Sequence, residues 1–336
     1  MTAVSDHRIE TLPVLVLQPH NRCNCRCVMC DIWKIRGVRE ITRSDLEPHV
    51  SSLRKLQVRW IVFSGGEPLM HSDLSGLCEL LRAERIRLTL LTAGLSLERH
   101  ASTVVQWMDD LIVSIDGPPA IHDCIRGVNG AFRQLQRGIE TVRGLRPGLP
   151  IHGRCTVQKV NCSELRNTVR TAHAISLNSV SFLAADVTSA AFNRPEGWPP
   201  ERQSQIGLTL LETETLETEI DALVRENAQD MESGFVVENA EKLRRIARHF
   251  RVHLGQVPPI SPRCNAPWVS AVVEADGTVK PCFFHRGLGN IHDQSLLDIL
   301  NGDDAVRFRS QLDVATDPTC RDCVCSLFLR NSFARR

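Results

Sequence analysis

Short apolar runs that are typical of buried strands alternate with helical patterns between residue 13 and about residue 190. The predicted strands are Val14–Leu17, Trp60–Phe63, Leu88–Leu91, Leu111–Ile115, Ile151–Val157 and Ser179–Leu183. The predicted helices between them are Arg43–Leu56, Ser72–Glu84, Leu97–Met108, Ala131–Leu145 and Glu164–Ala174. This alternation predicts βα units around a parallel sheet. Six units are too few for a closed eight-stranded barrel, so we expect an α/β fold, an open partial (β/α)6 barrel with its chemistry at the C-terminal ends of the strands.

The chain beyond the sixth predicted strand indicates two further parts. A loop-like stretch at residues 188–208 is followed by two predicted helices, Thr209–Asn227 and Val237–His249, and then by a proline-rich boundary. A β-hairpin is predicted from Trp268–Glu274 and Thr278–Phe283, around an Ala-Asp-Gly turn. The domains that we expect are a core at residues 10–205, a helical connector at 206–258 and a small domain with a hairpin and a helix at 259–336.

Cysteine is the residue type that says most about chemistry, with 13 copies among 336 residues. The segment from Met1 to Pro13 lacks the basic start and apolar stretch of a signal peptide. No apolar run reaches the roughly 20 residues of a membrane span. The net charge of +1 provides no general attraction for nucleic acid. We therefore expect a cytoplasmic protein without nucleic-acid or membrane partners, in which clustered cysteines indicate metal binding rather than disulfides.

Three cysteines with the spacing Cys23-x3-Cys27-x2-Cys30 follow the first predicted strand directly. A [4Fe–4S] cluster has four irons, so three thiolates from one loop leave one iron open to a substrate or cofactor. A zinc site is the alternative, although zinc usually takes two separated pairs of ligands. A simple electron carrier would instead use Cys25 as a fourth ligand, but the spacing Cys-x-Cys-x-Cys places three sulfurs very close together for a single cluster.

Later strands end in motifs that accompany this loop. The second leads into Gly65-Gly66-Glu67-Pro68, the fourth into Ser114-Ile-Asp-Gly, and His-Asp-Cys124-Ile-Arg126-Gly comes next. Together with the cysteine spacing, these motifs resemble the radical S-adenosylmethionine (SAM) superfamily. The resemblance implies that the open iron of a [4Fe–4S] cluster binds SAM, which is cleaved reductively to a 5′-deoxyadenosyl radical.

The resemblance also implies roles for single residues. Gly65, Gly66 and Glu67 would hold the amino group of SAM, and Ser114 would contact its ribose or carboxylate. Arg126 would pair with the SAM carboxylate, or else form a salt bridge at a helix start. Independently of the resemblance, Asp186 follows the sixth predicted strand, so we expect its carboxylate to face the open mouth of the barrel and to bind substrate or act as a base; a carboxylate that caps a turn is the alternative.

A second group of cysteines frames the predicted hairpin. The pattern Cys264-x17-Cys282-x37-Cys320-x2-Cys323 resembles the twitch module, a shortened SPASM domain that holds one auxiliary [4Fe–4S] cluster. By this resemblance those four cysteines are the ligands, with Cys325 in reserve. A structural zinc site with four thiolates is the alternative.

The two clusters together suggest oxidation of a small-molecule substrate. Known twitch enzymes include dehydrogenases of aminocyclitols and epimerases of sugar-like antibiotics, so we expect dehydrogenation of a small polar, carbohydrate-like substrate. Flavodoxin or ferredoxin is the expected electron donor. In the epimerase alternative, Cys124 would return a hydrogen atom from its thiol. Maturation of a ribosomal peptide is the other alternative, disfavoured because the first strand begins near residue 14 and leaves no space for a preceding leader-binding domain.

Overall fold

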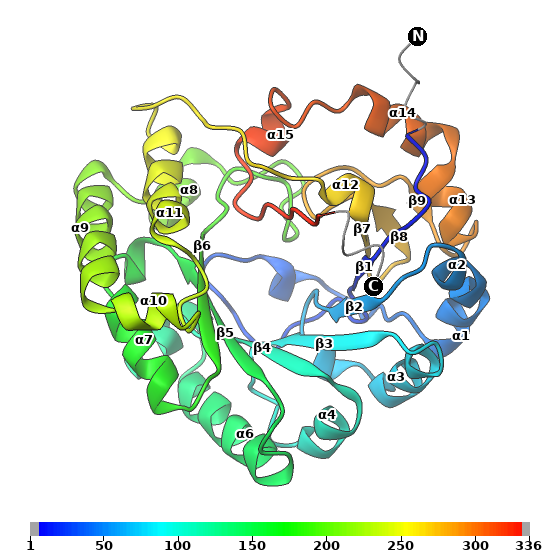
Figure 1. Cartoon of the computed structure of the whole chain (residues 1–336), viewed down its shortest axis with the longest axis horizontal. Coiled ribbons are helices and arrows are strands. Elements are labelled where there is room, and N and C mark those ends of the chain that lie inside the picture. Colours follow the sequence, from blue (N-terminus) through cyan, green and yellow to red (C-terminus); the bar gives the residue numbers. More distant parts are fainter. Residues whose placement is uncertain (1–6, 331–336) are drawn as a thin grey trace. The chain divides into compact units, whose positions relative to one another are not determined.

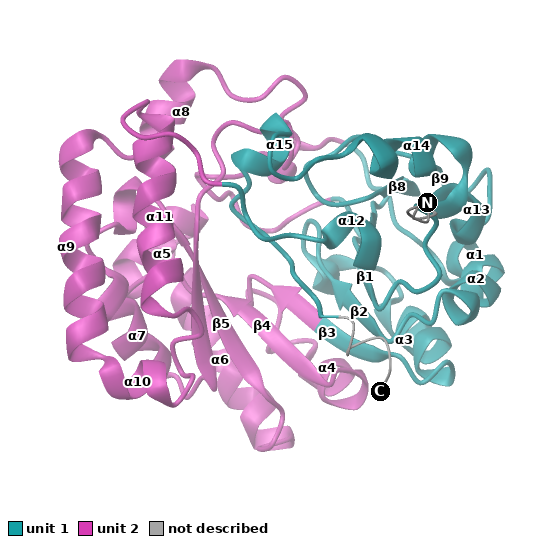
Figure 2. Ribbon diagram, turned by 45° about the horizontal axis from the view of Figure 1, so that its top comes forward, with its two compact units in different colours: residues 1–21, 37–89, 261–336 teal, residues 22–36, 90–260 magenta. Residues whose placement is uncertain are grey.

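The computed structural model describes residues 7–330, and most of its helices and strands are labelled in Figure 1. They form two compact units, one drawn from residues 7–21, 37–89 and 261–330 and the other from residues 22–36 and 90–260 (Figure 2). Strand β3, Arg87–Thr92, is divided between the units. In the described part of the chain, no helix has the length and apolar character that a membrane span requires.

The second unit is built on three parallel strands, β4 (Asp110–Ser114), β5 (Ile151–Val157) and β6 (Ser179–Ala184). Residues in β5 are alternately buried and partly exposed, as the two faces of a strand require. The accompanying helices are α4 (Ala101–Trp107), α5 (Pro119–Arg126), α6 (Ala131–Leu145) and α7 (Leu165–Ala174). In α6, Leu135, Ile139 and Val142 form a buried stripe, which is the spacing of one helix face.

Four further helices complete the second unit: α8 (Pro200–Ile206), α9 (Leu210–Glu226), α10 (Ala228–Glu232) and α11 (Ala240–His253). Helix α9 begins with a capping box, in which Thr209 and Glu212 each accept from the other's backbone N–H. An ion pair between Arg251 and Glu217, with 2.6 Å between Nε and Oε1, joins α11 to α9.

The first unit contains the first two strands of the predicted barrel together with the C-terminal hairpin. Its strands are β1 (Val14–Leu17), β2 (Trp60–Phe63), β7 (Ser270–Val273), β8 (Thr278–Lys280) and β9 (Gly289–Asn290). Val14 is paired in parallel with Trp60 of β2 on one side and with Ser270 of β7 on the other. The C-terminal hairpin therefore extends the sheet of the core instead of forming a sheet of its own.

Short helices surround these strands: α1 (Arg43–Leu46), α2 (Val50–Lys55), α3 (Leu74–Ala83), α12 (Ala266–Val269), α13 (Leu296–Asn301), α14 (Asp303–Gln311) and α15 (Pro318–Arg321). Single 3₁₀ turns lie at Glu47–His49 and Pro68–Met70 in this unit, and at Ile32–Lys34 and Lys159–Asn161 in the second unit. The predicted continuous helix Arg43–Leu56 is wrong in one respect, because the turn Glu47–His49 divides it. Pro48 lies in that turn, and its missing N–H interrupts the helical hydrogen bonds.

The α/β fold class is confirmed, since strands β1 to β6 alternate with helices along the chain and the strand pairs described within each core unit are parallel. Strands β1, β2 and β5 and helix α6 have the predicted bounds. The hairpin is also present, with Val273 opposite Val279 and Gly277 at a φ of +84° in its turn. Cys124 was expected in a loop but lies in helix α5, which begins at Pro119, two residues after Gly117.

Candidate functional site

The cysteine loop, which we define as residues 23–31, lies in the second unit, and backbone N–H groups contact two of its sulfur atoms. Cys25 and Cys27 are buried, while Cys23 and Cys30 are partly exposed. The Cys23 sulfur accepts a hydrogen bond from the backbone N–H of Cys25 at 3.4 Å, and the Cys30 sulfur accepts one from Ile32 at 3.5 Å. Hydrogen bonds to Cys23 and Cys27 raise the pKa of the Cys25 thiol, so Cys25 acts as a donor to its two neighbours.

Helix α5 delivers Arg126 to the cysteine loop. Its guanidinium donates to the Cys27 sulfur at 3.6 Å through one terminal nitrogen, and the other lies 2.5 Å from Oδ2 of Asp116. The backbone carbonyls of Arg126 and Ile125 also accept from the loop. Gly127 ends the helix at a φ of +62°, and an added Cβ would lie only 2.4 Å from the carbonyl oxygen of Arg26. This close approach explains why glycine follows Arg126.

The electrostatics of Cys27 follow from these contacts. A hydrogen bond from Cys25 and the charge of Arg126 lower the pKa of Cys27, against the opposing effect of burial. Burial alone would lower the pKa of Arg126, but the charges of Asp116 and Cys27 raise it. The site therefore favours a thiolate at Cys27 beside a permanent cation.

A second set of side chains, Arg194, Trp198 and Arg202, holds the loop from residues 192–202; we call it the loop clamp. Arg194 donates to the carbonyl of Met29 at 2.5 Å, and Arg202 donates to the carbonyl of Val28. The indole N–H of Trp198 donates to Asp31 at 2.7 Å. Arg194 also stacks on the Trp198 ring, with 3.7 Å between the guanidinium carbon and the ring centroid.

Asp186 is tied to the loop clamp. Its Oδ2 accepts from Arg194 at 2.9 Å and from the hydroxyl of Ser189 at 2.5 Å, and its Oδ1 accepts from the backbone N–H of Ser189. The side chains of Asp186 and Arg194 are 5% and 1% exposed, so the ion pair is almost fully desolvated. The contacts to Ser189 are those of a carboxylate that caps a turn.

The glycine-rich motif lies in the first unit, immediately after β2. Gly65 has a φ of +106°, and an added Cβ would lie 2.7 Å from the Cβ of Gln18, so only glycine fits there. Glu67 is fully buried and accepts from the backbone N–H of Leu69 at 3.1 Å. Gly66 donates to the carbonyl of His20 at 3.3 Å. In the other unit, Ser114 is the last residue of β4 and is partly exposed.

The C-terminal cysteines lie together in the first unit. Burial raises the pKa of Cys282 and outweighs the backbone N–H donors of Phe284 and His285, which lower it; the charges of Cys264 and Cys325 raise it further. Burial also raises the pKa of Cys320 and of Cys323. Asp317 adds to this effect at Cys320 and the charge of Cys325 adds to it at Cys323, while the charges of Cys282 and Cys264 contribute at both. Cys325, the reserve candidate, is exposed, and its backbone N–H donates to the Cys323 sulfur at 3.3 Å.

Backbone N–H groups recur as donors to the predicted ligand sulfurs. The sulfurs of Cys23, Cys30, Cys264, Cys282 and Cys323 each accept from the N–H two residues later in the chain. Such donors stabilise thiolates and are among the contacts that tune iron–sulfur clusters. All thirteen cysteines of the described chain are free of disulfides. The sulfur-rich donor sets at both ends of the chain therefore fit iron–sulfur clusters.

Four cysteines lie away from both groups. Cys78 is in the buried face of α3, and Cys155 is fully buried in β5, where it accepts from Asn161 at 3.6 Å. Cys162 is buried close to the end of a 3₁₀ turn. Cys124, in contrast, is exposed on α5, two residues before Arg126.

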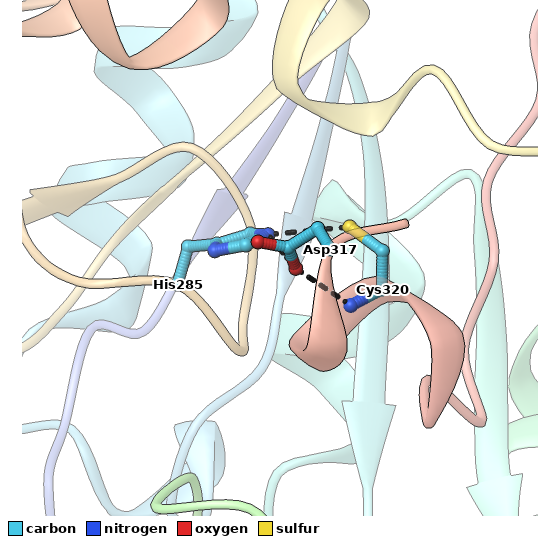
Figure 3. A group of neighbouring side chains, drawn as sticks. All are labelled: His285, Asp317 and Cys320. Atoms are coloured by element: carbon cyan, nitrogen blue, oxygen red, sulfur yellow. Dashed lines mark hydrogen bonds and ion pairs between the residues drawn. The ribbon is translucent and has the colours of Figure 1, made fainter. Parts of the chain in front are cut away.

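Sequence reasoning missed two groups of residues. The loop clamp falls in the stretch that was expected to be a loop without specific features, although Arg194, Trp198 and Arg202 could have suggested a cationic and aromatic contact surface. Near the C-terminal cysteines, His285, Asp317 and Cys320 lie together, with potential metal-binding atoms within 4.8 Å of one another (Figure 3). His285 follows Cys282 with a Cys-x2-His spacing, which is a signal for metal ligands.

Comparison with known families yields two matches. Residues 17–172 match the radical SAM superfamily, and residues 264–324 match SPASM, an iron–sulfur cluster-binding domain. The matched regions contain both predicted groups of cysteine ligands.

Individual relatives share parts of the chain. Pre-heme d1 synthase of Dinoroseobacter shibae is 31% identical over 157 residues, covering 46% of this chain and 38% of that protein. Fe-coproporphyrin III synthase of Methanosarcina barkeri is 30% identical over 159 residues, covering 46% of this chain and 39% of that protein. The match therefore spans about two fifths of the length of these curated relatives.

A solved structure extends the likeness to nearly the whole fold. The crystal structure of Streptococcus suis SuiB bound to precursor peptide SuiA aligns with a TM-score of 0.66 and 14% identity. It covers 95% of this chain and 72% of that one. At this identity the similarity establishes the partial-barrel fold with its C-terminal domain.

Proposed function

We propose that this chain, which belongs to the radical SAM superfamily and carries a C-terminal SPASM domain, is an oxidising enzyme with two [4Fe–4S] clusters. When bound, SAM and the first cluster supply a 5′-deoxyadenosyl radical that abstracts a hydrogen atom from the substrate. Flavodoxin or ferredoxin is the proposed donor of the initiating electron. The observation that carries the proposal is the presence of two separate, sulfur-rich donor sets with backbone N–H groups on their sulfurs.

Cys23, Cys27 and Cys30 are the proposed ligands of the SAM cluster. Cys25 is buried and its thiol donates to Cys23 and Cys27, so its sulfur is already engaged with two neighbours, which supports this choice of three ligands. Arg126 supports it further by placing a cation against Cys27.

The SAM contacts that we propose are Gly65, Gly66, Glu67, Ser114 and Arg126. The complete burial of Glu67 supports its part, since a buried carboxylate suits a cationic amino group. Arg126 already contacts Cys27 and Asp116, so its proposed contribution is at the cluster end of the cofactor.

The oxidation follows from counting electrons. After a hydrogen atom is removed, the substrate radical must lose one electron and one proton to form a new double bond. Cys264, Cys282, Cys320 and Cys323 are proposed to hold the cluster that receives this electron. One SAM is then consumed for each molecule of oxidised product.

The substrate that we propose is a small polar, carbohydrate-like molecule. The names of the relatives provide two rivals: haem-related tetrapyrroles from the two synthases, and a precursor peptide from SuiB. A panel with one member of each class would identify the class by substrate-dependent formation of 5′-deoxyadenosine. Product formation only with a peptide or a tetrapyrrole would refute the carbohydrate-like substrate and leave the oxidation to be tested separately.

The reaction type is tested with two variants of the reconstituted protein. Replacing Cys23, Cys27 and Cys30 together by Ala should leave roughly four of about eight irons and abolish 5′-deoxyadenosine formation. Cys282→Ala should spare SAM cleavage but stop product formation. Continued 5′-deoxyadenosine formation by the triple variant would refute the site, and unchanged product formation by Cys282→Ala would remove the auxiliary cluster from the reaction.

A further inference from the structure

Two of the seven proposed ligand sulfurs contact a nitrogen atom of a side chain. Five sulfurs accept from the backbone N–H two residues later, as described above. Cys27 accepts instead from the guanidinium of Arg126, and Cys320 contacts the imidazole of His285. Arg126 belongs to a motif of the core, whereas His285 lies outside the proposed ligand set and is related to it in sequence only by its spacing from Cys282.

The imidazole of His285 is held in one place. Its side chain is 8% exposed, and its ring meets the edge of Phe308 at a centroid distance of 5.0 Å. Nε2 lies 3.4 Å from the Cys320 sulfur and 3.9 Å from Oδ1 of Asp317 (Figure 3). Both neighbours are acceptors when Cys320 is a thiolate ligand, so the tautomer that fits has its proton on Nε2.

Asp317 fixes the position of Cys320 in turn. Its carboxylate caps helix α15 by accepting from the backbone N–H of Cys320 at 2.9 Å. The same carboxylate places a negative charge close to the Cys320 sulfur, which disfavours adding an electron there. The N–H of His285 is directed at the same sulfur and opposes this effect.

We propose that His285 is a tuning residue, which donates a hydrogen bond from Nε2 to the Cys320 sulfur and thereby raises the reduction potential of the auxiliary cluster. Hydrogen bonds to cluster sulfurs stabilise the more negative, reduced state. A higher potential makes the cluster a better acceptor for the electron that leaves the substrate. The inference rests on the ligand assignment of the proposed function, and it concerns a residue outside that ligand set.

The test measures the cluster potential directly, without turnover. The parent is the full-length protein with Cys23, Cys27 and Cys30 replaced by Ala, so that the auxiliary cluster alone gives a signal. Its midpoint potential is measured by redox titration followed by electron paramagnetic resonance. In this parent, His285→Leu should lower the ratio of reduced to oxidised cluster about tenfold at fixed potential, which is about 59 mV for one electron.

Three further variants separate a hydrogen bond from a general disturbance. His285→Gln retains an N–H donor and should restore part of the shift. Asp317→Asn can still cap α15 but removes the opposing charge, so it should move the potential in the positive direction. His292→Leu changes a histidine just after strand β9 and should leave the potential unchanged.

The outcomes distinguish this inference from the ligand assignment. An unchanged potential in His285→Leu, with iron retained, would overturn the inference alone. Loss of the roughly four remaining irons in both His285 variants would also overturn it, because His285 would then be a ligand rather than a donor. Absence of iron from the triple-Ala parent would overturn the ligand assignment, and the inference with it.

Discussion

The ion pair between Arg194 and Asp186 decides between two roles for Asp186, and its removal has a calculable effect. Arg194 makes three side-chain hydrogen bonds: to the Met29 carbonyl at 2.5 Å, and to the carbonyl and Oδ2 of Asp186, each at 2.9 Å. Arg194→Met would retain most of the apolar stem but leave a buried carboxylate without its cation. Breaking a buried ion pair from one side costs roughly 3–5 kcal/mol, so we expect the free energy of unfolding to fall by about 4 kcal/mol.

The double variant Arg194→Met with Asp186→Leu refines this value. Burial lowers the pKa of Arg194 in spite of Asp186, which indicates that the desolvation of Arg194 is not fully offset by its attraction to the carboxylate. Removing both charges should therefore recover much of the loss. The carbonyls of Met29 and Asp186 would still lack a donor, at about 1 kcal/mol each, so the double variant should remain about 2 kcal/mol below the parent.

Urea unfolding followed by circular dichroism measures the stability of both variants, with Arg225→Met, at an exposed position of helix α9, as the control. The control should change the free energy of unfolding by less than about 0.5 kcal/mol. A loss below about 1 kcal/mol for Arg194→Met would refute the reasoning, as would a double variant no more stable than the single one. Asp186→Asn tests the function of this residue. If turnover is lost while the free energy of unfolding is unchanged, Asp186 contacts substrate or acts as a base rather than only supporting the loop clamp.

Two further predictions concern helix α5. Gly127→Ala should weaken the contact of the helix with the cysteine loop, because the new Cβ would lie 2.4 Å from the carbonyl oxygen of Arg26 at a φ of +62°. We therefore expect this variant to lose iron from the first cluster, as measured by chemical analysis. Gly144→Ala is the control and should retain that iron, because an added Cβ there meets no atom of another residue within 4 Å. If the enzyme is an epimerase, turnover in D2O should place deuterium on the product carbon and Cys124→Ala should abolish this; an oxidised product without solvent deuterium would contradict the epimerase.

Local patterns predicted the elements that depend on local physics. The strands and α6 follow from apolar spacing, and the hairpin follows from the Ala-Asp-Gly turn, whose Gly277 adopts the left-handed conformation. The parallel pairing of β1 with β7 was not predictable in this way, because it joins Val14 to Ser270 across more than two hundred residues of chain. Period and propensity describe each strand but do not select its partner.

The residues of the candidate site also divide into those that a local pattern predicts and those that depend on contacts between distant parts of the chain. Cysteine spacing and the Gly65-Gly66-Glu67 motif stand out in the sequence because they are compact. Arg194 is separated from its partner Met29 by 165 residues, and His285 is separated from Cys320 by 35. Neither contact has a local signal strong enough to predict its partner, since long polar side chains are common on surfaces.

The supports of the cysteine loop have a consequence for how the first cluster is assembled. The N–H groups of Arg26 and Val28 donate to the end of α5, while the carbonyls of Val28 and Met29 accept from Arg202 and Arg194. These supports come from two segments that are distant in sequence from the loop and from each other. The isolated loop sequence would lack them and would keep only contacts within itself, such as the hydrogen bond from the N–H of Cys30 to the carbonyl of Cys27. The second unit must therefore have folded before the loop presents Cys23, Cys27 and Cys30 in the arrangement described here, and we infer that cluster insertion follows folding of this unit.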